Sequence, residues 1–137
     1  MRKRKYIIAG IPIPQKRHRH TSRGFVYDPS AKDKKAIILS LKTQTKDVFS
    51  GPVSLYVHFY MKIPKAYYRS GKYSKLLKKD APVFHTKKPD IDNLCKFLFD
   101  CCNGVVFNDD SQIFQLSASK TYAELPRTEF TIIETNH

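Results

Sequence analysis

The sequence has few cysteines, few acidic residues and no apolar run long enough to cross a membrane. A membrane-spanning helix needs about 20 consecutive apolar residues. Near the amino terminus, Pro12 and Pro14 interrupt the apolar stretch that follows the first basic residues, so this stretch is too short for a secretory signal. The 137 residues fit one domain. We therefore expect a cytoplasmic protein of one domain with no membrane partner.

The three cysteines fit neither a disulfide framework nor a zinc site. Their number is odd, Cys101 and Cys102 are adjacent, and no Cys-x-x-Cys pair occurs. Cys95 and the adjacent pair lie in an apolar segment. We therefore expect all three to be small residues of the core.

Acidic residues are outnumbered and unevenly distributed. The chain has 25 Lys and Arg against 12 Asp and Glu, which gives a net charge of +13. Residues 1–88 contain 22 basic and 4 acidic residues, whereas residues 89–137 contain 3 and 8. Clustered basic side chains displace counterions from phosphates, so the first part predicts a nucleic-acid partner. A basic surface that serves only solubility is the alternative.

The hydrophobic pattern predicts one α+β domain over residues 1–137, with a mixed β-sheet and two main helices packed on it. Strict alternation over residues 53–62 predicts a strand with one buried face. Further strands are expected at residues 5–8, 105–107, 112–122 and 127–134.

One helix is expected from about residue 31 to 46, capped by Asp28 or Ser30, with Ile37, Ile38 and Leu41 as a modest core stripe. The other follows Asp92 or Asn93 and continues for about ten residues. Its apolar residues recur at helical spacing and predict a buried stripe formed by Leu94, Phe97, Leu98 and Cys101.

Two basic segments interrupt this pattern. Residues 15–29 predict a loop or hairpin with Gly24 near its tip. Residues 65–88 contain eight Lys or Arg interleaved with tyrosines and Phe84. Basic side chains beside aromatic rings suit phosphates and unstacked bases. A solvated insertion, whose tyrosines pack on the domain, explains the same composition.

Five of the nine aspartates fall between Asp90 and Asp110. An extended backbone before the second helix is expected to point Asp90 and Asp92 in the same direction. The strand and turn after this helix are expected to bring Asp109 and Asp110 back beside its beginning. Three converging carboxylates would offer the oxygen ligands that Mg²⁺ prefers. Lys96 follows Asp92 by one helical turn on the same face.

This constellation favours a metal-dependent nuclease. A magnesium ion held there would activate water and stabilise the charge on the leaving oxygen of a phosphodiester. Lys96 could neutralise the scissile phosphate or orient the attacking water. Taken singly, Asp92 is explained as a helix cap and Asp109 with Asp110 as a turn pair. Their combination within a basic protein favours the metal site.

The motifs around this helix resemble the RusA family of Holliday-junction resolvases. Lys88 precedes the pattern Pro-Asp-x-Asp-Asn-Leu-x-Lys at residues 89–96, which is followed by Asp100 and by the Asp-Asp-x-Gln-Ile motif at residues 109–113. Nearer the amino terminus, Pro-x-Pro at 12–14, Arg-x-Arg at 17–19 and Tyr-x-Pro at 27–29 also resemble the family. Two departures are His18, in place of a proline, and a longer basic segment at 65–84.

The resemblance implies an α+β, Mg²⁺-dependent homodimer that nicks four-way DNA junctions symmetrically in recombination and repair. It implies that Asp90, Asp92 and Asp110 are catalytic metal ligands and that Lys96 is a catalytic or DNA-contacting lysine, with Asp110 favoured over Asp109. A two-fold dimer also suits paired cuts on strands that a two-fold axis relates. The candidate DNA-binding residues are Lys16, Arg17, Arg19, Arg23, Lys87 and Lys88.

Two other functions stay open at this point. One is a binding module for DNA or RNA in which the aspartates are structural. The other is a metal nuclease that acts on flaps or single strands.

Overall fold

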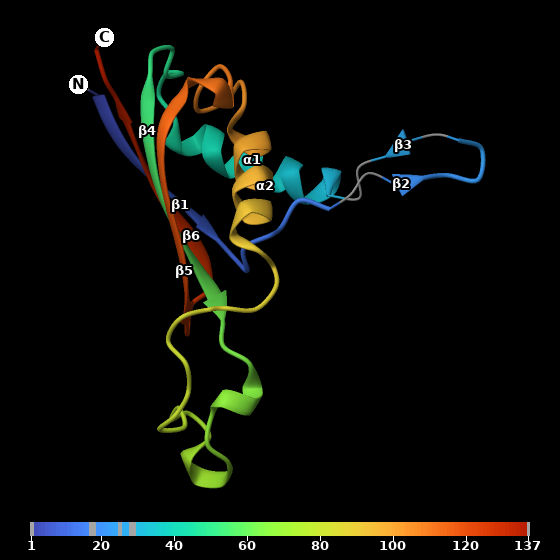
Figure 1. Cartoon of the computed structure of the whole chain (residues 1–137), viewed down its shortest axis with the longest axis vertical. Coiled ribbons are helices and arrows are strands. Elements are labelled where there is room, and N and C mark those ends of the chain that lie inside the picture. Colours follow the sequence, from blue (N-terminus) through green and yellow to red (C-terminus); the bar gives the residue numbers. More distant parts are fainter. Residues whose placement is uncertain (1, 17–18, 25, 28–29, 137) are drawn as a thin grey trace.

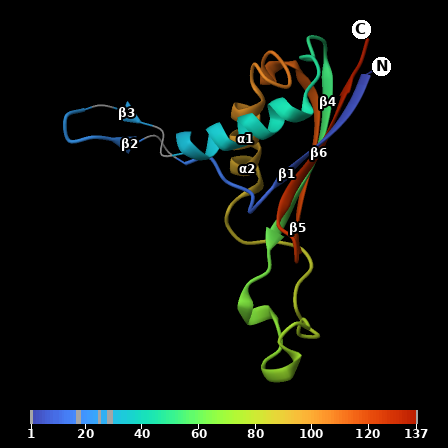
Figure 2. The same cartoon turned by 180° about the vertical axis from the view of Figure 1, so that it is seen from behind.

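A four-stranded β-sheet with two helices on one face forms the body of the protein, as the computed structural model in Figure 1 shows. The structure describes residues 2–16, 19–24, 26–27 and 30–136. Two segments project from the body in different directions, and the view from behind in Figure 2 shows both clear of the sheet. The expected α+β architecture with two main helices is confirmed.

The sheet is mixed, with one parallel pair and two antiparallel pairs of strands. Its strand order is β1 (Arg2–Ala9), β6 (Arg127–Glu134), β4 (Val53–Lys62) and β5 (Ile113–Ala123). β6 pairs antiparallel with both β1 and β4, whereas β4 and β5 are parallel. A parallel pair needs a crossover connection, and the chain between β4 and β5 includes the second helix. β1 and β5 therefore form the two edges.

β4 follows the expected alternation closely. Val57, Phe59 and Met61 are buried, whereas Tyr56 and Lys62 are exposed. One face of the strand is buried against the helices because side chains alternate across a sheet. In the same core, the rings of Tyr6 and Phe130 stack with their centroids 4.8 Å apart.

The helices are α1 (Ala31–Gln44) and α2 (Ile91–Cys102). α1 begins after Ser30, as expected, and ends two residues earlier than expected. It buries Leu41 fully and packs Ile37 and Ile38 partly against the core. Neither helix, nor any other in the described ranges, is long and apolar enough to cross a membrane.

α2 buries the expected stripe, and full burial of each large apolar side chain contributes about 1.5–3 kcal/mol. Asp90 is the N-cap of α2, so the expectation of Asp92 or Asn93 was wrong by two or three residues. After Asn103, Gly104 adopts the left-handed conformation (φ 75°) that terminates a helix. The buried stripe consists of Leu94, Phe97, Leu98 and Cys101.

All three cysteines are free and buried, as expected. Burial raises the pKa of the Cys95 thiol to about 11. Burial also raises the pKa of Cys102 well above its ordinary value. The thiols of Cys95 and Cys102 therefore stay protonated at neutral pH and act as packing groups.

The strand expected at residues 105–107 is wrong. These residues form a turn in which Val106 and Phe107 are fully buried. Phe107 makes only isolated bridges, to Phe49 and Asn103, and the Phe49 N–H donates to the Val106 carbonyl at 2.9 Å. The apolar run therefore fills the space beyond the end of α2 and adds no strand to the sheet.

The projections correspond to the two basic segments. In the first, β2 (Arg19–His20) and β3 (Val26–Tyr27) pair as the expected hairpin, and Gly24 between them has a φ of 83°. The second, residues 65–84, is called the lobe below. It contains two short helices, η1 (Lys65–Tyr67) and η2 (Gly71–Tyr73), and every residue from 69 to 80 is exposed. The lobe therefore has no core of its own.

Candidate functional site

Asp90 and Asp92 lie at the start of α2 with their carboxylates accessible. Asp90 has an extended backbone (φ −70°, ψ 148°) and its side chain makes no capping hydrogen bond. Asp92 already lies in the first helical turn, and its side chain is 66% exposed. The expectation that an extended backbone aligns both carboxylates is therefore wrong, because the helix begins between them. Both still occupy the helix end whose partial positive charge favours anions.

Lys96 lies where the sequence predicts. Its ammonium is 3.9 Å from the Asp92 carboxylate, one turn along α2, and its side chain is 64% exposed. An ion pair between two groups this exposed contributes little to stability. Both groups therefore remain available to a ligand that approaches the start of the helix.

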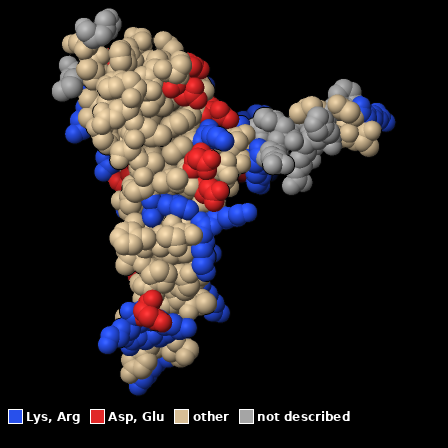
Figure 3. All heavy atoms as spheres, viewed as in Figure 1, with Lys and Arg blue, Asp and Glu red and all other residues tan. Residues whose placement is uncertain are grey.

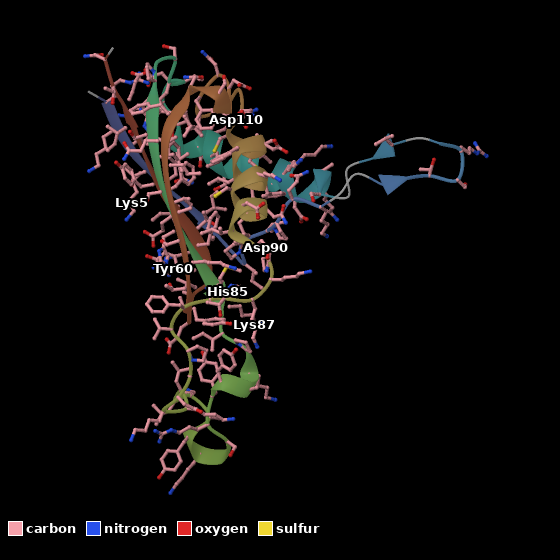
Figure 4. All side chains as sticks on the ribbon, in the orientation of Figure 1. Lys5, Tyr60, His85, Lys87, Asp90 and Asp110 are labelled. Carbon is pink, nitrogen blue, oxygen red and sulfur yellow. The ribbon has the colours of Figure 1, made fainter. Side chains whose placement is uncertain are left out.

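Within one chain, Asp109 and Asp110 do not reach the start of α2. Figure 4 shows Asp110 beyond the far end of the helix from Asp90. A helix of 12 residues is about 18 Å long. The described residues contain no cluster of three side chains able to hold a metal ion. The expected convergence within a single chain was therefore wrong, because the chain re-enters the sheet at the end of α2 and only then runs back as β5.

Asp109 and Asp110 differ in their surroundings. Asp109 caps a short helix, η3 (Asp110–Gln112): its carboxylate accepts the Ser111 N–H at 2.9 Å, and Gln112 Oε1 accepts the Asp109 N–H at 2.8 Å. The hydrogen bonds from Ser111 lower the pKa of Asp109. This capping role occupies Asp109, which leaves Asp110 as the better candidate for binding a ligand.

The start of α2 and the turn before it contact two segments that are distant in the sequence. The Gln15 N–H donates to the Asn93 carbonyl at 2.9 Å, so the base of the hairpin packs against α2. Lys120 of β5 donates from its ammonium to two carbonyls of the turn. No local pattern reveals these contacts, because they join residues that are distant in the sequence.

An open pocket lies beside Asp90 and joins the hairpin base to the Pro-Asp motif. Its lining combines a carboxylate, a lysine and two amides with two prolines. A phosphate group that entered it would meet the basic side chain and the helix start together. The lining residues are Pro14, Gln15, Lys88, Pro89, Asp90 and Asn93.

The candidate DNA-binding residues lie on both sides of Asp90. Lys87 and Lys88 are exposed on the turn immediately before it, and Lys16 is exposed at the base of the hairpin. Arg23 is exposed next to Gly24, and Arg19 begins β2, whereas Arg17 lies outside the described residues. Figure 3 shows basic side chains gathered over the lobe and its junction with the body, and acidic ones higher on the helical side.

His85 directly follows the lobe, and it lies close to Lys87 in Figure 4. The residue is 8% exposed, and the centroid of its ring lies 5.0 Å from that of Tyr122. Burial lowers the pKa of His85, and the nearby charges of Lys120 and Lys87 lower it further. His85 is therefore a neutral packing group at pH 7, and its role was not evident from the sequence.

Comparison with known proteins agrees with this arrangement. The family described as Endodeoxyribonuclease RusA matches residues 9–133. The chain is also 35% identical, over 137 aligned residues, to the uncharacterized protein YqaN of Bacillus subtilis (strain 168), and the alignment covers 95% of each chain. The family match includes the hairpin, the lobe and both aspartate motifs. The chain therefore belongs to the RusA family of endodeoxyribonucleases.

Proposed function

We propose that the protein is a Mg²⁺-dependent endodeoxyribonuclease that resolves Holliday junctions by paired, symmetric nicks in DNA recombination and repair. The observation that carries this proposal is the set of Asp90, Asp92 and Lys96 at the exposed start of α2, between two basic projections. The projections would contact the phosphates of the DNA, while the start of the helix would meet the scissile linkage.

The carboxylates at the start of α2 fit a magnesium ion. Mg²⁺ is usually held by one or two carboxylates together with substrate phosphate and water. The Asp90 side chain makes no capping bond, and within the described part of the chain Asp92 forms a single ion pair, which is exposed. When bound, the ion supplies an activated water and stabilises charge on the leaving oxygen. Lys96 would hold the scissile phosphate beside Asp92.

A second copy of the chain would bring a third carboxylate to this site. The start of β5 follows Asp110, and its end lies beside the turn that carries Asp90. Antiparallel pairing of β5 with the same strand of a partner would therefore place Asp110 of the partner subunit near Asp90. The two-fold axis of such a pair would generate two equivalent sites, as symmetric nicking requires.

The exposed part of β5 suits this pairing. Residues 83–85 bond to β5 only at its end, through Lys120, Thr121 and Tyr122. Residues 111–119 carry no charge, and Phe114 and Leu116 are 59% and 45% exposed. An edge strand without charges, prolines or cover readily pairs with another strand.

The substrate is tested with purified protein, Mg²⁺ and three DNAs at equal salt: a mobile four-way junction, a flap and a linear duplex. We expect fast nicking of the junction alone, at symmetrically related positions on opposing strands. Equal rates on all three DNAs would support the flap or single-strand nuclease instead. Tight binding without cleavage in any divalent metal would support the binding module.

The shared site is tested by mixing two inactive variants, Asp90→Asn and Asp110→Asn. In mixed dimers one site would lose the carboxylates of both Asp90 and Asp110. The other site would keep Asp90, Asp92 and Asp110, so we expect nicking of one strand to return. The control is each variant alone at the same total concentration. Failure to recover any nicking, after subunit exchange has been verified with differently tagged chains, would contradict a site built from two subunits.

A further inference from the structure

Lys120 lies near the end of β5, and its half-buried side chain reaches the turn before Asp90. Its ammonium donates to the carbonyl oxygens of Lys87 and Pro89, both at 2.7 Å. These carbonyls lie two residues apart, and the second belongs to the residue directly before Asp90. One side chain therefore holds the backbone of the whole turn.

The remaining contacts of this region position the turn less directly. The Tyr122 N–H donates to the Val83 carbonyl at 2.9 Å, and the His85 N–H donates to the Lys120 carbonyl at 3.3 Å. These bonds tie residues 83–85 to β5 but do not reach the turn itself. No carboxylate forms an ion pair with Lys120 among the residues that the structure describes. Both hydrogen bonds that its ammonium donates within the described part of the chain serve the turn.

We propose that Lys120 is a positioning residue for the magnesium site, an inference that rests on the proposed function. Groups that orient metal ligands without touching the metal commonly change metal affinity by about 10–100-fold when they are removed. Lys120 orients the backbone of a ligand in this manner. An ammonium has three donors, so it can hold two carbonyls at once, and an uncharged aliphatic side chain would leave both without this partner.

β5 gives this contact a second consequence. The strand starts directly after the short helix that carries Asp110, and near its other end it carries the lysine that holds the turn of Asp90. A paired strand is a stiff element of fixed rise per residue. Through Lys120, β5 therefore sets the distance between Asp110 and the turn of Asp90.

The test compares Lys120→Met, which removes the donors but keeps the length of the side chain, with Lys120→Arg, which keeps donors. Lys42→Met is the matched control, since Lys42 is an exposed lysine of α1. We measure the Mg²⁺ concentration for half-maximal junction nicking, junction binding without metal, the Tm, and hydrogen exchange of the amides at 85–92. For Lys120→Met we expect about a tenfold or larger rise in the Mg²⁺ midpoint and faster exchange at 85–92. Metal-free junction binding should change little.

Lys120→Arg should restore the midpoint to within about threefold of the wild type, because a guanidinium can donate to two carbonyls. Equal Mg²⁺ midpoints in Lys120→Met and Lys42→Met would overturn the proposal. So would a loss of metal-free junction binding comparable with that of a Lys87 variant, because Lys120 would then contact DNA. If Lys120→Met lowers the Tm strongly, the Mg²⁺ midpoints of Lys120→Arg and Lys120→Gln test the proposal in its place.

Failure of the proposed function is distinguishable from failure of this inference. If the wild-type protein nicks no junction in Mg²⁺ or Mn²⁺, the nuclease proposal fails whatever the Lys120 variants do. The hydrogen-exchange comparison still applies, because it needs no substrate. Unchanged exchange at residues 85–92 in Lys120→Met would show that Lys120 does not hold the turn.

Discussion

At the start of α2, Asp90 and Asp92 present carboxylates that the fold itself does not use, whereas at the other end Asp109 is engaged in a capping box. Between these ends, Asp100 pairs with Lys34 of α1 at 3.3 Å. The same residue type therefore stabilises the fold at one end and remains available for a ligand at the other. Hydrogen-bond partners, rather than residue type, separate a structural aspartate from a candidate ligand.

The largest expected effect concerns the available carboxylates. Asp90→Asn and Asp92→Asn should each reduce Mg²⁺-dependent nicking by about a thousandfold or more, since removal of one member of a catalytic set usually abolishes its function. Junction binding should persist, because a neutral side chain repels phosphate less than a carboxylate does. Single-turnover nicking and gel-shift binding measure the two effects. Asp33→Asn on α1 is the control. Near-wild-type nicking in Asp90→Asn would show that the available carboxylate at the start of α2 has no catalytic role.

A second prediction concerns the lysines next to the start of α2. Replacing Lys87 and Lys88 together with alanine should weaken junction binding and lower the salt dependence. Each phosphate contact contributes about 0.9 to the slope of log K against log salt, so the slope should fall by about 2. Binding titrations at several salt concentrations measure it. An unchanged slope would show that neither lysine contacts phosphate and that the basic turn only adds bulk charge.

A third prediction separates Asp109 from Asp110. Asp109→Ala removes the side chain that caps η3, so the Tm should fall by a few degrees while Mg²⁺-dependent nicking persists. Asp110→Asn should leave the Tm near that of the wild type and abolish nicking. Thermal unfolding and junction nicking of both variants check this. The reverse pattern would exchange the roles of the two residues.

The smallest effect is a pH dependence of stability. Burial lowers the pKa of His85 and of His58 below the ordinary 6.5, so the unfolded chain binds protons more readily than the folded one. The free energy of unfolding should therefore fall as the pH drops from 7 through 6.5 and below. Urea unfolding of the wild type and of His85→Asn between pH 5 and 8 measures it. An equal pH dependence in both would assign the effect to other groups.

Much of the fold follows from local patterns. β4 and α2 were expected nearly at their true ends, because alternation over residues 53–62 and the spacing of Leu94, Phe97, Leu98 and Cys101 each identify one buried face. The prediction for the residues around Phe107 was wrong. Its apolar neighbourhood suggested a strand, but the backbone there finds only isolated bridges. A short apolar run does not reveal whether a strand partner lies beside it.

The candidate site also combines contacts that the sequence predicts with contacts that it does not. Asp92 and Lys96 are one turn apart on one helix, so their proximity follows from helical geometry once the helix is recognised. The contact of Lys120 with the turn before Asp90 joins residues 31 and 33 apart, and no periodicity encodes such a contact. The positions of Gln15 and His85 were missed for the same reason.

Sequence alone determined the helix that carries Asp90, Asp92 and Lys96, the basic segments beside it and the resemblance to an endonuclease family, because each depends on residues that are close along the chain. Only the tertiary structure decided that Asp110 lies at the opposite end of α2 and that β5 supports the turn of Asp90. Those positions depend on the direction in which the chain re-enters the sheet after the helix. That direction is set by the packing of the whole core rather than by any short stretch of residues.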